Sequence, residues 1–160
     1  MKLDLDIQNA SGSDHHPSTD EMTQWVMAAL DNRLEQAELA IRIVNEAEIS
    51  QLNSDYRHKQ GPTNVLSFPA DLHPGVDVPL LGDLVICAPV VEREAIQQSK
   101  SLQAHWAHMV IHGTLHLLGY DHIDDHDADV MEGLEIELLK HMNFPNPYVL
   151  PQEECTQNHE

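Results

Sequence analysis

A histidine-rich segment at residues 105–122 reads HWAHMVIHGTLHLLGYDH and contains five of the chain's 12 histidines. Three of these residues, His112, His116 and His122, follow the pattern H-x-x-x-H-x-x-G-x-x-H. Residues four apart on a helix share a face, so the first two imidazoles can reach one ion together. A break at Gly119 then allows a third ligand to return. The spacing predicts a three-histidine metal site.

The other two histidines of this segment, His105 and His108, fall on the same helix face as His112 and His116, within an arc of about 80°. Taken singly, each is more simply a surface histidine. A triad of His108, His112 and His116 is disfavoured, because three side chains in line along a straight helix cannot converge on a tetrahedral centre. We therefore expect His105 and His108 to support the site from outside. The expected cofactor is Zn²⁺, one ion per chain, with a fourth position open to water as in catalytic sites.

The same histidine spacing occurs in metzincin proteases, which carry a glutamate as general base directly after the first histidine. In this chain that position is Gly113. Peptide hydrolysis by the usual mechanism would lack its base, which argues against a protease. A zinc hydrolase of another substrate remains open, and it would need a replacement carboxylate near the metal.

The elements that must position these histidines follow from residue spacing. Alternating or continuous apolar residues predict four strands, at 3–7, 39–43, 64–68 and 80–87. Helical spacing, caps and prolines predict five helices, at 18–33, 45–57, 90–98, 102–118 and from 124 or 125 to 142. We expect an α+β fold: a single domain at 1–148 with a small four-stranded mixed sheet, packed by about five helices. The zinc site would lie at the end of a helix in the C-terminal half, and residues 149–160 would form a poorly ordered tail.

Some polar and aromatic residues near the histidines allow two interpretations. Asn64 and Ser67 on the third strand could face a cleft or could bond to the protein backbone. Trp106 is more typical of a core residue than of a base-stacking platform. Asp121 and His126 are close enough in sequence to lie around the metal, although a capping or surface role is equally compatible.

Composition predicts a cytoplasmic protein without a membrane partner. The chain has 160 residues, 41% hydrophobic and 22% charged, which suits one globular domain. No apolar run approaches the roughly 20 residues that span a bilayer, and the N-terminus does not read as a signal peptide. Cys87 and Cys155 are far apart in the sequence and indicate neither a disulfide framework nor a cysteine zinc site.

A formal net charge of -19 opposes long-range attraction to nucleic acid. An anionic substrate would therefore need a local positive site. The sequence offers one close cationic cluster, Arg57-His58-Lys59, to which a bound divalent cation would add charge.

Three segments together resemble the YbeY family of rRNA maturation endoribonucleases: HGTLHLLGYDH at 112–122, LNSDYRHKQGPTNVLSF at 52–68 and LLGDLVI at 80–86. The resemblance extends from residue 3 to about 148. It implies a metal-dependent, single-strand-specific endoribonuclease that matures the 3′ end of small-subunit rRNA and takes part in ribosome quality control. The implied partners are single-stranded rRNA precursor and the small ribosomal subunit with its proteins, with no DNA expected. The family's zinc ligands correspond to His112, His116 and His122, and its functional arginine corresponds to Arg57.

The histidine spacing and the family resemblance are both compatible with one mechanism, in which zinc-activated water attacks a backbone phosphodiester. In this hypothesis Arg57 pairs with the phosphate oxygens. The general base is unassigned, and a 2′-hydroxyl nucleophile that leaves a cyclic phosphate is an open alternative. A non-catalytic assembly factor with a structural zinc is a third hypothesis, which the acidity of the chain favours.

Overall fold

The computed structural model describes residues 2–14, 16–31, 36–70, 80–120 and 125–148. Its four strands are β1 (Lys2–Asn9), β2 (Gln36–Val44), β3 (Val65–Pro69) and β4 (Leu80–Cys87). They form one sheet in the order β1-β2-β4-β3, in which β1, β2 and β4 run parallel and β3 is antiparallel to β4. The predicted four-stranded mixed sheet is confirmed.

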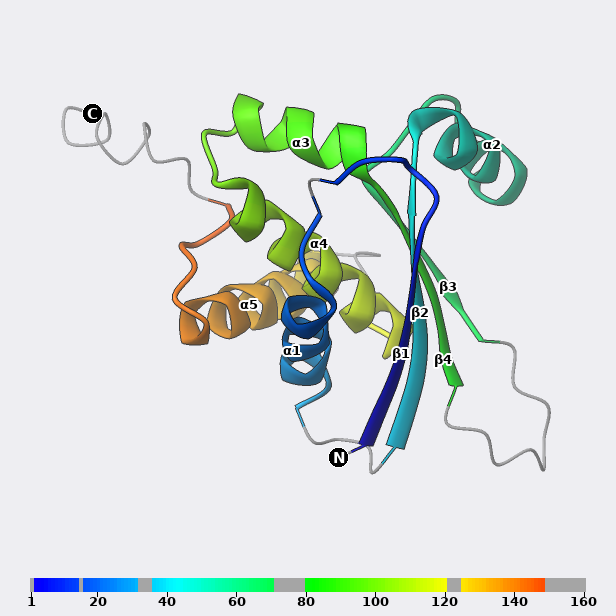
Figure 1. Cartoon of the computed structure of the whole chain (residues 1–160). Coiled ribbons are helices and arrows are strands. Elements are labelled where there is room, and N and C mark those ends of the chain that lie inside the picture. The colour runs from blue at the N-terminus through cyan, green and yellow to red at the C-terminus, as the bar shows by residue number, and fades with distance from the viewer. Residues whose placement is uncertain (1, 15, 32–35, 71–79, 121–124, 149–160) are drawn as a thin grey trace, which may run out of the picture.

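Five helices surround the sheet: α1 (Thr19–Leu30), α2 (Glu46–Arg57), α3 (Ala88–Gln97), α4 (Leu102–Leu117) and α5 (Asp125–His141). Figure 1 shows α1, α4 and α5 on one side of the sheet and α2 on the other. The fold is α+β with five helices, as the sequence predicts. Within the described residues, no helix is long and apolar enough to cross a membrane.

The larger core lies between the sheet and α1, α4 and α5. Strand β2 contributes Leu39, Ile41 and Ile43, whose alternation places all three on the face that these helices cover. A smaller core on the opposite face packs Ile49 of α2 against β3 and β4. Burial of apolar surface on both faces holds the sheet between two layers of helix.

Helix α4 is the central helix of the larger core. Twelve of its 16 residues are buried, so it is apolar on nearly all sides. Ser101 caps its N-terminus by accepting a hydrogen bond from the Ala104 amide at 3.1 Å. Trp106 is 1% exposed and belongs to the core, as expected. Because the middle of α4 is enclosed, its histidines can reach solvent only near the C-terminal end.

Two details of the helices differ from the sequence prediction. A capping box of Ser18 and Glu21 starts α1 at the predicted position, but α1 ends at Leu30 and not near residue 33. The chain leaves the helix at Asp31, which adopts a left-handed conformation with φ of 49°. On α5, helical spacing groups Val130 with the apolar residues expected to be covered, but Val130 is 42% exposed, while Met131 is fully buried.

Candidate metal centre

Four histidines line one face of α4, as the helical spacing predicts. The ring centroids of successive pairs lie 6.2, 6.1 and 4.6 Å apart, from His105 through His108 and His112 to His116. His105 and His108 are buried, whereas His112 and His116 are partly exposed. The row of histidines therefore runs from the protein interior to its surface.

The imidazoles of His112 and His116 meet through their Nε2 atoms, which are 3.2 Å apart. Nδ1 of His116 donates to the carbonyl oxygen of Tyr120 at 2.9 Å, and Nδ1 of His112 donates to Oε2 of Glu135 at 2.8 Å. A neutral imidazole carries one proton, so each Nε2 then presents a lone pair. Two lone pairs at this distance repel each other unless a proton or a cation lies between them. This donor set fits a divalent metal ion that prefers imidazole nitrogen.

Gly119 ends α4 and turns the chain back toward the histidines. Its φ of 106° is positive, and glycine adopts such backbone conformations far more readily than residues that carry a Cβ. The Gly119 amide donates to the His116 carbonyl at 3.0 Å, and the Tyr120 amide donates to the Leu115 carbonyl at 3.1 Å. This is the predicted glycine termination. His122, the predicted third ligand, lies outside the described residues, as does Asp121.

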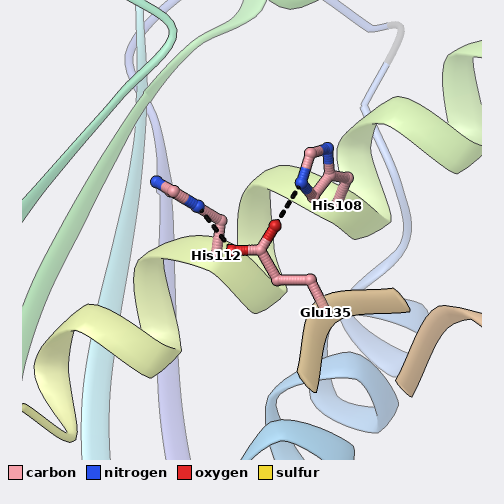
Figure 2. A group of neighbouring side chains, drawn as sticks. All are labelled: His108, His112 and Glu135. Carbon is pink, nitrogen blue, oxygen red and sulfur yellow. Dashed lines mark hydrogen bonds and ion pairs between the residues drawn. The ribbon is translucent and has the colours of Figure 1, made fainter. Parts of the chain in front are cut away.

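Glu135 of α5 is a fully buried carboxylate that reaches two of the histidines (Figure 2). Its Oε1 pairs with Nε2 of His108 at 2.6 Å and also accepts from the Tyr148 hydroxyl, while Oε2 pairs with His112. Burial alone would raise the pKa of Glu135, but the hydrogen bonds from His108 and His112 outweigh it and lower this pKa to about 2. Glu135 is therefore an anion inside the protein.

Sequence reasoning missed Glu135. The available signal was its position on α5, four residues after the buried Met131 and within the apolar stripe. A carboxylate at such a position needs a buried partner. His108, which is predicted to support the site, contacts this carboxylate, whereas His126 is exposed.

In the described part of the chain, one group of three residues could hold a metal ion. His108, His112 and Glu135 each offer one atom, and these atoms lie within 4.8 Å of one another. The Nε2 atoms of His112 and His116 form a candidate pair beside it, and the predicted third ligand of that set, His122, lies outside the described residues. The contact of His112 with Glu135 is made through Nδ1, whereas its contact with His116 is made through Nε2.

Gly113 lets α4 approach the sheet closely. A Cβ at this position would lie 2.7 Å from Leu84 Cδ2 and 3.3 Å from Ser67 Oγ. The Ser67 hydroxyl donates to the Gly113 carbonyl at 3.1 Å. The residue that separates this site from the metzincin pattern is thus packed against β3 and β4, and Ser67 bonds to backbone.

Glu94 of α3 forms a second carboxylate-histidine pair with α4. Its Oε1 pairs with His105 Nε2 at 2.8 Å and accepts from Asn64 Nδ2 at 3.1 Å. Burial would raise the pKa of Glu94, but the hydrogen bonds from His105 and Asn64 hold it below its usual value. Asn64, which directly precedes β3, therefore links the start of this strand to α3, which is a structural role.

Replacing Glu94 with glutamine is expected to cost about 1.5 kcal/mol of stability at neutral pH, a typical contribution of a hydrogen bond to a charged group. Because the folded-state pKa of Glu94 is depressed, its contribution is present above the unfolded value of about 4.5 and is lost as pH falls through the folded value. Urea denaturation over a pH series should show a steeper acid loss in wild type than in Glu94→Gln. Parallel curves would contradict this assignment.

Arg57 is the last residue of α2 and is exposed, as are His58 and Lys59. The predicted cationic cluster is therefore accessible to solvent. The side chain of Asn53 donates to the Gly61 carbonyl at 3.0 Å and folds back the segment that follows Arg57. Among the residues that the structure describes, no hydrogen bond or ion pair joins Arg57 to the histidines.

The fold and site together define an α+β protein with a histidine-rich, metal-type site at the end of a buried helix. The fold is similar to the solution structure of TM1509 from Thermotoga maritima, with a TM-score of 0.56 and 23% sequence identity, over 88% of this chain and 91% of that chain. A family model described as Endoribonuclease YbeY matches residues 6–143. The chain belongs to the YbeY endoribonuclease family, a family of nucleases that act on RNA.

Proposed function

We propose that this protein is a zinc-dependent, single-strand-specific endoribonuclease that matures the 3′ end of small-subunit rRNA and serves ribosome quality control. The observation that carries the proposal is the pair of Nε2 atoms, 3.2 Å apart, on His112 and His116 of a YbeY family chain. An RNA substrate could reach these two histidines, because both lie at the partly exposed end of α4.

The proposed zinc ligands are His112, His116 and His122, with one ion per chain. This set is preferred over the one that includes His108 and Glu135, which are 6% and 0% exposed and so cannot meet an RNA backbone. When bound, the ion supplies Lewis-acid activation of water and of a phosphoryl oxygen. The Tyr120 carbonyl holds the ring of His116 in place, as the partners of metal-binding histidines usually do.

Arg57 is proposed to pair with phosphate oxygens of the RNA and to stabilise the charge that develops during cleavage. A guanidinium presents a planar set of donors that matches phosphate. The chain has only eight lysines and arginines against 27 acidic residues, so an exposed cation has particular weight in holding an anionic substrate. Its exposure on α2 supports this role.

The proposed partners are single-stranded rRNA precursor and the small ribosomal subunit with its proteins, in the cytoplasm. The net charge of -19 opposes capture of free RNA at long range. Contacts with proteins of the small subunit, guided by charge complementarity, would bring this acidic protein to its substrate.

Replacing Arg57 with alanine is expected to slow cleavage of single-stranded rRNA precursor roughly 10- to 100-fold, the value of one or two charge-assisted hydrogen bonds. Zinc content and thermal stability should not change. Arg93→Ala is the matched control, since Arg93 is also a surface arginine and pairs with Glu46 at 3.0 Å. Equal cleavage by wild type, Arg57→Ala and His112→Ala would defeat the enzymatic assignment. A product that ends in a 2′,3′-cyclic phosphate would show that the nucleophile is the 2′-hydroxyl and not water.

The second candidate is a non-catalytic assembly factor with a structural zinc, which the high negative charge favours. In that case zinc removal would lower the melting temperature and ribosome association. Protein purified free of contaminating nucleases would cut no RNA.

A further inference from the structure

Glu135 is a buried charged residue with an unusually complete set of partners. Both of its oxygens accept hydrogen bonds, from His108 and Tyr148 on one and from His112 on the other. These partners come from α4 and from the segment after α5. Burying an ion is costly unless it is fully paired, so such a cluster points to a specific task.

The role of Glu135 depends on which nitrogen of His112 its carboxylate contacts. Oε2 of Glu135 lies 2.8 Å from Nδ1 of His112, and a carboxylate oxygen in this position accepts the N–H of that nitrogen, so the contact places the ring proton on Nδ1. Nε2 of the same ring is then left with its lone pair, directed at Nε2 of His116 at 3.2 Å. Without this contact the proton could reside on either nitrogen, and the ring could rotate.

We propose that Glu135 is a positioning residue of the metal centre, which fixes the tautomer and the orientation of His112 so that Nε2 faces the ion. This inference rests on the proposed function, in which the site takes zinc. A carboxylate that holds the far nitrogen of a metal-binding histidine also raises the basicity of that ligand.

The same contacts give His108 and Tyr148 a place in the arrangement. Both side chains contact Oε1 of Glu135, and Nε2 of His108 lies 2.6 Å from it. These contacts orient the carboxylate so that Oε2 faces His112. Glu135 is also excluded as the general base, because it is 0% exposed and touches His112 on the side of the ring away from His116.

The test compares zinc affinity in wild type, Glu135→Gln and Glu94→Gln by competition with a chromophoric chelator, with folding checked by circular dichroism. Glu94→Gln is the matched control, because it alters the other carboxylate-histidine pair of α4 without touching His112 or His116. Glu135→Gln should bind zinc roughly 10- to 100-fold more weakly, the usual effect of losing such a partner. Glu94→Gln should stay within about twofold of wild type.

Equal affinity in wild type and Glu135→Gln would overturn the inference while leaving the zinc enzyme intact. Failure of wild type to bind zinc would overturn the proposed function, and this inference with it. An equal loss in Glu94→Gln would also overturn it, because the effect would then belong to the fold of α4.

A measurement on the wild-type protein does not depend on any variant folding. Long-range ¹H–¹⁵N NMR of the zinc-free protein at mildly alkaline pH should show His112 with its proton on Nδ1. A predominant Nε2 proton on His112 would overturn the inference.

Discussion

A His116→Ala variant is expected to lose zinc and to cleave single-stranded RNA roughly a thousandfold more slowly than wild type. A catalytic ion supplies several kcal/mol to the transition state, and about 4 kcal/mol corresponds to this factor. His116 is partly exposed at the end of α4, where its ring nitrogens contact the Tyr120 carbonyl and His112 and do not enter the apolar core. The fold should therefore tolerate its loss.

The measurement pairs metal content, from elemental analysis of the purified variant, with initial rates on a single-stranded rRNA precursor. His141→Ala serves as the control, since the His141 side chain is 79% exposed and lies at the end of α5. Retention of wild-type cleavage by a zinc-free His116→Ala protein would contradict the proposed mechanism. If His116→Ala is less stable and the wild-type protein cleaves no RNA, the assembly-factor hypothesis is favoured.

Introducing the metzincin base by Gly113→Glu is expected to cost at least about 3–5 kcal/mol of folding stability, the range for an unpaired charge in a protein interior. The first side-chain atom alone would lie 2.7 and 3.2 Å from the two terminal carbons of Leu84, which is fully buried. The remaining atoms would push α4 away from the sheet or leave a carboxylate among apolar groups.

Urea denaturation can measure this cost directly. Gly133→Ala is the matched control, because Gly133 is an exposed glycine of α5 and a Cβ added there would have no neighbouring atom of the described residues within 4 Å. This variant should be neutral or stabilising by up to about 1 kcal/mol, since alanine favours helix. Wild-type stability in Gly113→Glu would show that α4 does not pack against Leu84 as described.

These contacts connect the chemistry of the site to its packing. The small residue that brings α4 onto the sheet occupies the position where a protease would carry its base. A peptidase of metzincin type would therefore need a different approach of helix to sheet, not only a different residue. This agrees with membership of a family that acts on RNA.

The sequence alone was enough to predict those features that lie within a single segment of the chain. The spacing of His112 and His116 follows from the helical repeat, and the end of α4 follows from the left-handed conformation that Gly119 adopts. The strand pattern of β2 and the capping box of α1 are of the same kind, as is the α+β class with its four strands. Each of these patterns can be recognised from residues close together in the chain.

Contacts between segments decided the rest. Glu135 reads as one polar residue on an amphipathic helix until α5 packs on α4 and brings it to His108 and His112, 27 and 23 positions away. The missing base at Gly113 acquires a packing reason only from the proximity of Leu84. Exposure of Val130 likewise depends on how α5 is rotated against its neighbours. Helical and strand periodicities report which residues share a face, but the partner that covers that face is set by the packing of the whole chain.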